Sequence, residues 1–148
     1  MNRVAKEILE TIRYATISTT DKNEQPWAAP VWYVFDNDLD IYWWSPIGSQ
    51  HSKNIERNSQ IYITVFNSAA PEGEGKGLYF RATASVIEDN KLSKAITLYN
   101  KSTSIFKLST GNCTGDAPTR LYKAIIQESW INDGLERDGF YVDRRVDL

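Results

Sequence analysis

The chain has 148 residues, a formal net charge of −2 and an apolar fraction of 41%, which together predict one folded domain with its own hydrophobic core. The charged fraction of 24% argues against intrinsic disorder, and the pI near 5.4 argues against nucleic acid as a partner. No apolar run reaches the roughly 18 residues of a membrane span, and the N-terminus lacks a signal-peptide core. We therefore expect a cytoplasmic protein with no membrane partner.

The first half of the chain predicts one helix followed by a meander of antiparallel strands. Val4, Ile8 and Ile12 recur every four residues in a helix over 2–12 that Asn2 can cap. Aromatic and β-branched residues then predict three strands joined by tight turns, at 14–20, 27–35 and 39–45. Because no long crossover separates these strands, we do not expect a parallel sheet.

The second half predicts two further helices and four further strands. A Gly-Ser pair opens a short helix over 48–58, and Asn90 caps a later helix with an apolar stripe made of Leu92, Ala95, Ile96 and Tyr99. The strands are predicted at 61–66, 78–88, 121–131 and 140–142, with a turn beginning at Asp133-Gly134. The fold class is therefore mainly β with peripheral helices, a six- to seven-stranded antiparallel barrel.

Aromatic residues are abundant and cluster between residues 27 and 44. The chain has five Trp and eight Tyr. Large rings in strands fill a sheet core or a subunit interface, and they also bind flat cofactors. Composition alone leaves these uses open.

The helix predicted over 48–58 carries the pattern of an anion site. His51, the only histidine, lies in its first turn, where unpaired backbone N–H groups and the helix dipole attract anions. One face groups residues at helical spacing that suit a phosphate monoester, namely Gln50, Lys53, Asn54 and Arg57. The alternative is a solvated basic helix face.

Other chemistries find no support in the sequence. One cysteine and one histidine exclude an internal disulfide and a zinc site made by protein ligands alone. Cys113 lies in a polar loop without a second histidine to activate it. The glycine-rich segment 72–77 lacks the Lys-Ser or Lys-Thr of a phosphate loop, and Asp36 and Asp38 are explained by a turn.

Seven segments in order carry a resemblance: ATIST (15–19), PWAAPVW (26–32), IYWWS (41–45), HSKNI (51–55), GLYFRATA (77–84), RLYK (120–123) and WIND (130–133). Together they resemble the pyridoxamine 5′-phosphate oxidase-like, FMN-binding split-barrel family. The resemblance covers nearly the whole chain. It implies a homodimer of split barrels with FMN at the subunit interface and a small-molecule substrate.

The resemblance also implies positions for the cofactor. The isoalloxazine ring would lie along Pro30, Val31 and Trp32, with Trp44 and Ser45 beside it, and Trp130 resembles a late tryptophan on the cofactor side. The phosphate would be held at the helix start by Ser49, Gln50, His51 and Lys53, in agreement with the anion site indicated by the residues themselves.

The chain departs from the oxidases of pyridoxamine phosphate at four positions. It has Ala29 and Val34 where those enzymes carry an arginine and a lysine, and Gln50 and His51 where they carry an Arg-Lys pair. We therefore do not expect this protein to oxidise pyridoxamine phosphate.

The resulting expectation is an FMN-dependent oxidoreductase that transfers hydride to or from a small, unidentified substrate, with no catalytic side chain identified. Two alternatives remain open. One is a deazaflavin-dependent reductase on the same barrel, which would need more positive charge for that cofactor's anionic tail. The other is a non-catalytic flavin- or haem-binding, stress-related protein.

Overall fold

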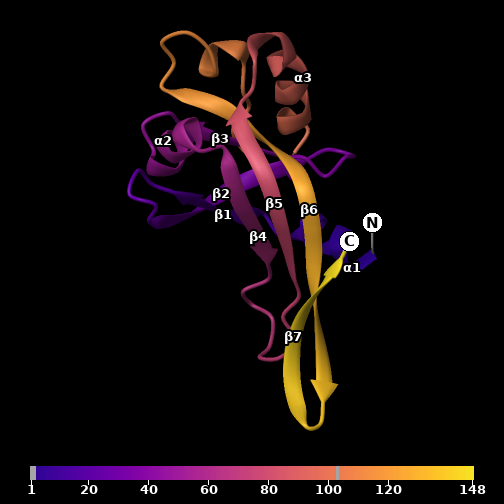
Figure 1. Ribbon diagram of the computed structural model, residues 1–148. Coiled ribbons are helices and arrows are strands. Elements are labelled where there is room, and N and C mark those ends of the chain that lie inside the picture. Colours follow the sequence, from indigo (N-terminus) through magenta and orange to yellow (C-terminus); the bar gives the residue numbers. More distant parts are fainter. Residues whose placement is uncertain (1–2, 103) are drawn as a thin grey trace.

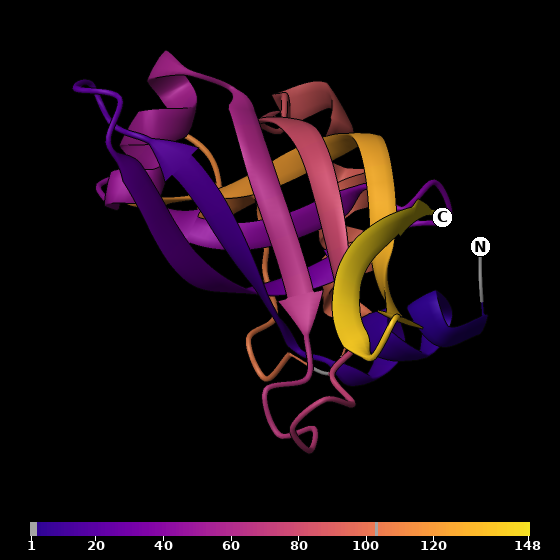
Figure 2. The same cartoon turned by 60° about the horizontal axis from the view of Figure 1, so that its bottom comes forward.

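A computed structural model describes residues 3–102 and 104–148 and shows an antiparallel barrel with three peripheral helices (Figures 1 and 2). Asn2, the predicted cap of the first helix, lies outside the described residues. The elements in chain order are α1 (Arg3–Thr11), β1 (Tyr14–Thr20), β2 (Pro26–Phe35), β3 (Ile41–Pro46), α2 (Gln50–Arg57), β4 (Gln60–Phe66), β5 (Gly77–Val86), α3 (Asp89–Asn100), a short 3-10 helix (Thr110–Asn112), β6 (Thr119–Arg137) and β7 (Phe140–Asp147).

Six strands close the barrel in the order β3-β2-β1-β4-β5-β6, with β3 pairing back onto β6, and β7 is added outside it. Every pairing is antiparallel, which confirms the predicted fold class. Alternation along each strand directs every second side chain inward, as in β1, where Ala15 and Ile17 are buried and Tyr14 is exposed.

The interior of the barrel is filled by large apolar side chains. Trp43 and Phe80 are fully buried there, and the Trp43 ring stacks on Tyr122 with centroids 5.5 Å apart. Helix α1 contributes Ala5 and Leu9 to the same core. This packing fixes β3 against β6 and so positions the segment that leads into α2.

A second core covers the outer face of β2, β3 and β6. The predicted apolar stripe of α3 packs here, which confirms that prediction. Cys113 is itself buried in this core although the loop around it is polar, and burial raises the pKa of its thiol.

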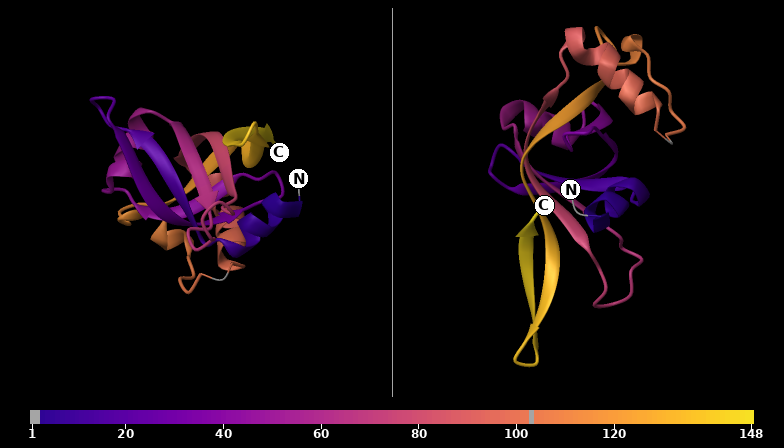
Figure 3. Two further views of the ribbon diagram at one scale, coloured as in Figure 1. Left: turned by 90° about the horizontal axis from the view of Figure 1, so that it is seen from below. Right: turned by 90° about the vertical axis from the view of Figure 1, so that its right-hand side faces the viewer.

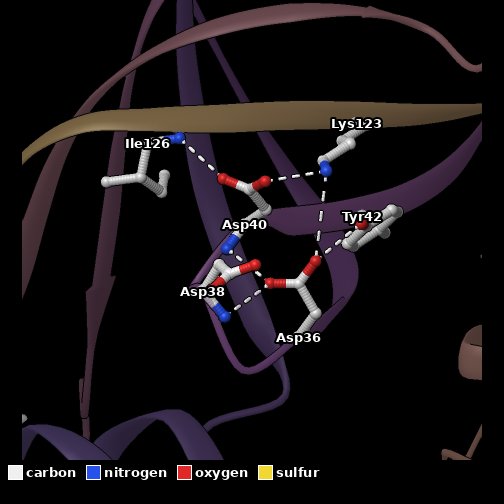
Figure 4. A network of polar contacts seen from close by, with 6 residues as sticks. All are labelled: Asp36, Asp38, Asp40, Tyr42, Lys123 and Ile126. Atoms are coloured by element: carbon white, nitrogen blue, oxygen red, sulfur yellow. Dashed lines mark hydrogen bonds and ion pairs between the residues drawn. The ribbon is translucent and has the colours of Figure 1, made fainter.

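A polar network ties the β2–β3 turn to β6 (Figure 4). The Lys123 ammonium lies 2.7 Å from Oδ2 of Asp40, and Oδ1 of Asp40 accepts the backbone N–H of Ile126 at 3.0 Å. Asp36 accepts the Tyr42 hydroxyl at 2.7 Å and, as expected of a turn aspartate, two backbone N–H groups of the turn. The network extends the β3–β6 pairing beyond Ile41 and thereby helps to close the barrel.

Several predicted boundaries are wrong: β3 begins at Ile41 and not at 39, and β7 runs on to Asp147 and does not end at 142. Strand β6 continues through Asp133-Gly134, and the chain turns at Asp138-Gly139, where φ is 53° and 78°. The resulting β6–β7 hairpin projects from the barrel (Figures 1 and 3). Helix α3 begins at Asp89 with Glu88 at the N-cap, so Asn90 lies inside its first turn.

No helix in the described part of the chain is both long and apolar enough to cross a membrane.

Candidate functional site

The barrel opens between β2 and β3. Strand β2 pairs with β1 along its length, from Thr20↔Pro26 to Tyr14↔Trp32. Its pairing with β3 covers only residues 33–35, and from Trp44 onward β3 is bound to β6 alone. Among the described residues, the β3-facing edge of β2 over 26–32 therefore has no strand partner, and its backbone polar groups are available to another molecule.

The three β2 residues predicted to lie along the cofactor belong to this open stretch. Pro30 is exposed, Val31 points into the barrel core, and Trp32 lies on the outer face with its ring edge-to-face against Tyr14. Pro30 lacks a backbone N–H, which is the usual reason for proline on an open edge. The structure thus places these residues together at the opening.

Two tryptophans beside the opening carry unpaired donors. Trp44 packs against Phe106 with centroids 5.9 Å apart, and the indole Nε1 atoms of Trp32 and Trp44 are buried without a hydrogen-bond partner among the described residues, as is that of Trp43 inside the barrel core. Buried donors are rarely left unpaired in proteins, so an acceptor from a ligand or from water is expected there.

Ser45, at the end of β3, meets the first turn of α2. The Nε2 atom of His51 lies 3.0 Å from Oγ of Ser45 and 3.1 Å from Oγ of Ser49. Ser49 in turn bonds the carbonyl of Pro46 and the hydroxyl of Ser52, each at 2.8 Å. Burial lowers the pKa of His51, so the imidazole in this hydroxyl cluster is neutral at pH 7.

The start of α2 lacks a side-chain cap. Ser49 occupies the N-cap with extended backbone angles, yet its hydroxyl makes no capping bond because it is committed to Pro46 and Ser52. The first backbone N–H groups of an uncapped helix point at an anion-binding position with the positive end of the helix dipole.

The helix face predicted from spacing lines one hollow of about 320 Å³ between α2 and the β1–β2 turn. Its lining residues are Asp21, Lys22, Gln50, Lys53, Asn54 and Arg57. Three cations against one carboxylate leave a formal charge of +2. The hollow is therefore suited to an anion.

Two polar residues of this face hold α2 in place. Asn54 is buried; its Nδ2 donates to the Thr19 hydroxyl at 2.9 Å and its Oδ1 accepts from Gln50 at 2.7 Å. Arg57 donates to the backbone carbonyls of Thr20 and Asp21. Lys53 is exposed, and its ammonium has no hydrogen bond or ion pair with any described residue.

The predicted residues thus fall on two sides of the same helix turn, and one lies elsewhere. Gln50 and Lys53 face the hollow, whereas Ser49 and His51 face Ser45. Trp130 lies on the outer face of the sheet, stacked on Tyr62 at 6.4 Å and beneath the Arg81 guanidinium at 5.7 Å. Within one chain the structure does not bring Trp130 to α2.

Sequence reasoning missed Asp21 and Lys22, which belong to the hollow. The sequence around them predicts only a turn between two strands. Their position beside α2 depends on how β1 and β2 pack against that helix. A second hollow, of about 300 Å³, was also unforeseen. It lies between α1, β2 and α3 and is largely apolar, lined among others by Leu9, Ile12, Trp32, Val34 and Leu98.

Comparison with known proteins gives both a family and several neighbours in structure. Residues 1–128 match the family of pyridoxamine 5′-phosphate oxidase. No curated protein matches the chain in sequence.

Three solved structures share the fold at low identity. A protein of unknown function from Agrobacterium tumefaciens is 22% identical with a TM-score of 0.73, and the match covers 95% of this chain but only 60% of that one. HutZ, the haem storage protein of Vibrio cholerae, is 18% identical over 84% of this chain and 89% of its own, with a TM-score of 0.71. An FAD-binding protein from Mesorhizobium loti is 15% identical over 88% and 94%, with a TM-score of 0.63. The family match over most of the chain and the closed six-stranded barrel lead to one conclusion: this chain belongs to the pyridoxamine 5′-phosphate oxidase family of split barrels.

Proposed function

We propose that this protein binds FMN at the opening between β2 and β3 and acts as an FMN-dependent oxidoreductase on a small substrate. The observation that carries the proposal is the position of the uncapped start of α2 directly after the point where β3 leaves β2. A flat ring and a phosphate can thus be bound by consecutive segments of one chain.

The phosphate end is supported by the charge and hydrogen-bonding capacity around α2. The N–H groups of its first turn donate to no side-chain cap, and the Lys53 ammonium and Gln50 amide line the adjacent hollow. A phosphate here would gain charge-assisted hydrogen bonds from groups that otherwise face solvent. The hydroxyls of Ser45 and Ser49 with neutral His51 complete the polar wall on the other side.

The ring end is supported by the open edge of β2. The backbone groups of Pro26 to Trp32 that face away from β1 lack a strand partner among the described residues, and the Nε1 donors of Trp32 and Trp44 lack acceptors. A bound flavin would supply two-electron redox chemistry, while the protein binds and orients the ring and limits its contact with water. The hollow beside Trp32, which is largely apolar but also lined by Arg13 and Lys101, is a suitable place for a small substrate.

A homodimer with the cofactor at the subunit interface is part of the proposal. Trp130 lies away from α2 within its own chain, on the outer sheet face, where its ring is partly exposed between Tyr62 and Arg81. A second subunit could bring such a face to the opening, as a symmetric interface does. The FAD-binding neighbour supports flavin as the cofactor class.

Haem is the competing ligand, since the HutZ neighbour stores it. His51 is the only histidine, and its Nε2 is engaged by Ser45 and Ser49. This arrangement favours a phosphate-binding role over metal ligation.

An absorption spectrum of the purified protein after incubation with FMN and, separately, with haem tests the proposal. After unbound ligand has been removed by gel filtration, we expect the protein incubated with FMN to show flavin absorption bands near ~370 and ~450 nm. Retention of a Soret band with no retained flavin would overturn it.

A further inference from the structure

The hollow between α1, β2 and α3 combines apolar walls with two cations. It has a volume of about 300 Å³, at the lower end of the range of small-molecule sites, so it suits a compact ligand. The side chains of Arg13 and Lys101 line it together with four aliphatic residues, namely Leu9, Ile12, Val34 and Leu98. An apolar wall with a few charged groups is typical of a site for a small amphipathic molecule.

Neither cation is neutralised within the described part of the chain. The Arg13 guanidinium donates to the backbone carbonyl of Glu10 at 3.0 Å and forms no ion pair there, and the Lys101 ammonium has no hydrogen bond or ion pair. The Glu10 carboxylate also lines the hollow, but its ion-pair partner is the exposed Lys6 ammonium, at 3.7 Å. Two cations and one carboxylate leave the lining with a formal charge of +1.

Two aromatic residues of β2 add further donors and no negative charge. The Tyr33 hydroxyl donates to the carbonyl of Leu9 at 3.1 Å, and burial raises the pKa of this phenol, so it is neutral at pH 7. Trp32 lines the same hollow, and its buried Nε1 donor has no acceptor among residues 3–102 and 104–148. Because unpaired donors are costly to bury, this lining favours a ligand that brings acceptor oxygens.

We propose that this hollow binds a small monocarboxylate with an apolar body, such as an aromatic acid. The aliphatic wall contacts the body, and Arg13 and Lys101 bind the carboxylate, whose single charge matches the formal charge of the lining. The planar guanidinium of Arg13 also matches the two oxygens of a carboxylate. A phosphate dianion fits less well, because it carries one charge more than the lining balances and would share the hollow with Glu10.

The hollow adjoins the proposed flavin position. Trp32 is the last residue of the open stretch of β2 and also lines the hollow, so one side chain borders both places. A carboxylic acid bound here would therefore lie beside the flavin as its substrate. That role rests on the proposed function, whereas binding of the acid in the hollow does not.

Titration of the full-length protein with benzoate and with benzamide tests the proposal. The two probes have nearly the same size and shape, and only benzoate is charged. The indole N–H signal of Trp32 in a proton–nitrogen NMR spectrum, assigned by its loss in Trp32→Phe, reports binding at the hollow. We expect benzoate to shift this signal and to bind about tenfold more tightly than benzamide.

Two variants with matched controls test the cations. Since Arg13 and Lys101 are exposed, Arg13→Gln and Lys101→Gln should each weaken benzoate binding by only about tenfold, and should change benzamide binding by less than about twofold. Arg3→Gln and Lys94→Gln remove exposed cations of α1 and α3 that lie outside the hollow, and they should leave both affinities unchanged.

Equal affinities for benzoate and benzamide would overturn the proposal, as would equal losses in Arg13→Gln and Arg3→Gln. Benzoate that binds without moving the Trp32 signal would overturn it as well. Failure of the proposed function has a different signature: the protein would retain no FMN, while benzoate binding and its dependence on Arg13 would persist. If FMN is retained and benzoate binds no better than benzamide, only the carboxylate site is refuted.

Discussion

Replacing Lys53 by alanine tests the phosphate position, because this ammonium lines the hollow and has no partner among the described residues. Removing it lowers the formal charge of the hollow from +2 to +1. A charge-assisted hydrogen bond contributes about 1.5–3 kcal/mol, which corresponds to roughly 10- to 150-fold in affinity. Since Lys53 is exposed, solvent screening favours the lower end, about 10- to 30-fold.

The assay is equilibrium titration of FMN and of riboflavin, followed by flavin fluorescence. Lys53→Ala should weaken FMN binding by that factor and leave riboflavin binding nearly unchanged, because riboflavin has no phosphate. Lys94→Ala is the matched control, an exposed lysine of α3 outside the hollow. Equal losses for both ligands would show that Lys53 acts through folding, and unchanged FMN affinity would refute the phosphate position.

Further predictions concern the barrel closure and the cluster at α2. Lys123→Met leaves the Asp40 carboxylate without its cation, so we expect the free energy of unfolding measured in urea to fall by about 2–4 kcal/mol. Adding Asp40→Asn should recover part of this loss, whereas a loss below about 0.5 kcal/mol for Lys123→Met would contradict the prediction. Burial acts to lower the pKa of Lys123, but the hydrogen bond to Asp40 outweighs it and raises that pKa above its usual value. The stabilisation by this pair is therefore complete below about pH 10.4 and is lost as the pH rises further. Thermal melts should show this loss of stability in the natural protein and not in Lys123→Met. Burial lowers the pKa of His51, so the unfolded chain binds the extra proton and the free protein should lose stability as the pH falls below about 6.5; His51→Gln should remove that loss in melts from pH 5 to 8. A phosphate dianion would favour protonated His51, so FMN affinity should fall from pH 5.5 to 8.5 more steeply in the natural protein than in His51→Gln, and parallel curves would count against this role. Asn54→Ala removes the buried bond to Thr19 and should cost about 1–3 kcal/mol of unfolding free energy, whereas an unchanged melting temperature would contradict the role of Asn54 in holding α2.

The strands could be predicted because their signals are local. Alternation and β-branched residues identified β1 to β5, and the apolar stripe of α3 identified its buried face. The turn of the last hairpin was predicted at the wrong position because Asp-Gly occurs twice, at 133–134 and at 138–139. Either pair suits a tight turn, and the choice depends on cross-strand partners such as Asp133 and Arg144, which only the folded register brings together.

The candidate site shows the same division between local and tertiary information. Helical spacing was enough to group Gln50, Lys53 and Arg57 on one face. It could not show that the β1–β2 turn would add Lys22, nor that the Ser49 hydroxyl would leave the helix uncapped by bonding Pro46. The opening between β2 and β3 also depends on the pairing of the end of β3 with β6, which joins residues about 75 apart in the chain.

A crystal structure of the protein grown with FMN tests the central claim most directly. The account predicts a phosphate within hydrogen-bond distance of the first-turn N–H groups of α2 and of Lys53, with the ring along the open edge of β2 at 26–32. A flavin bound elsewhere, with the start of α2 occupied only by water, would contradict it.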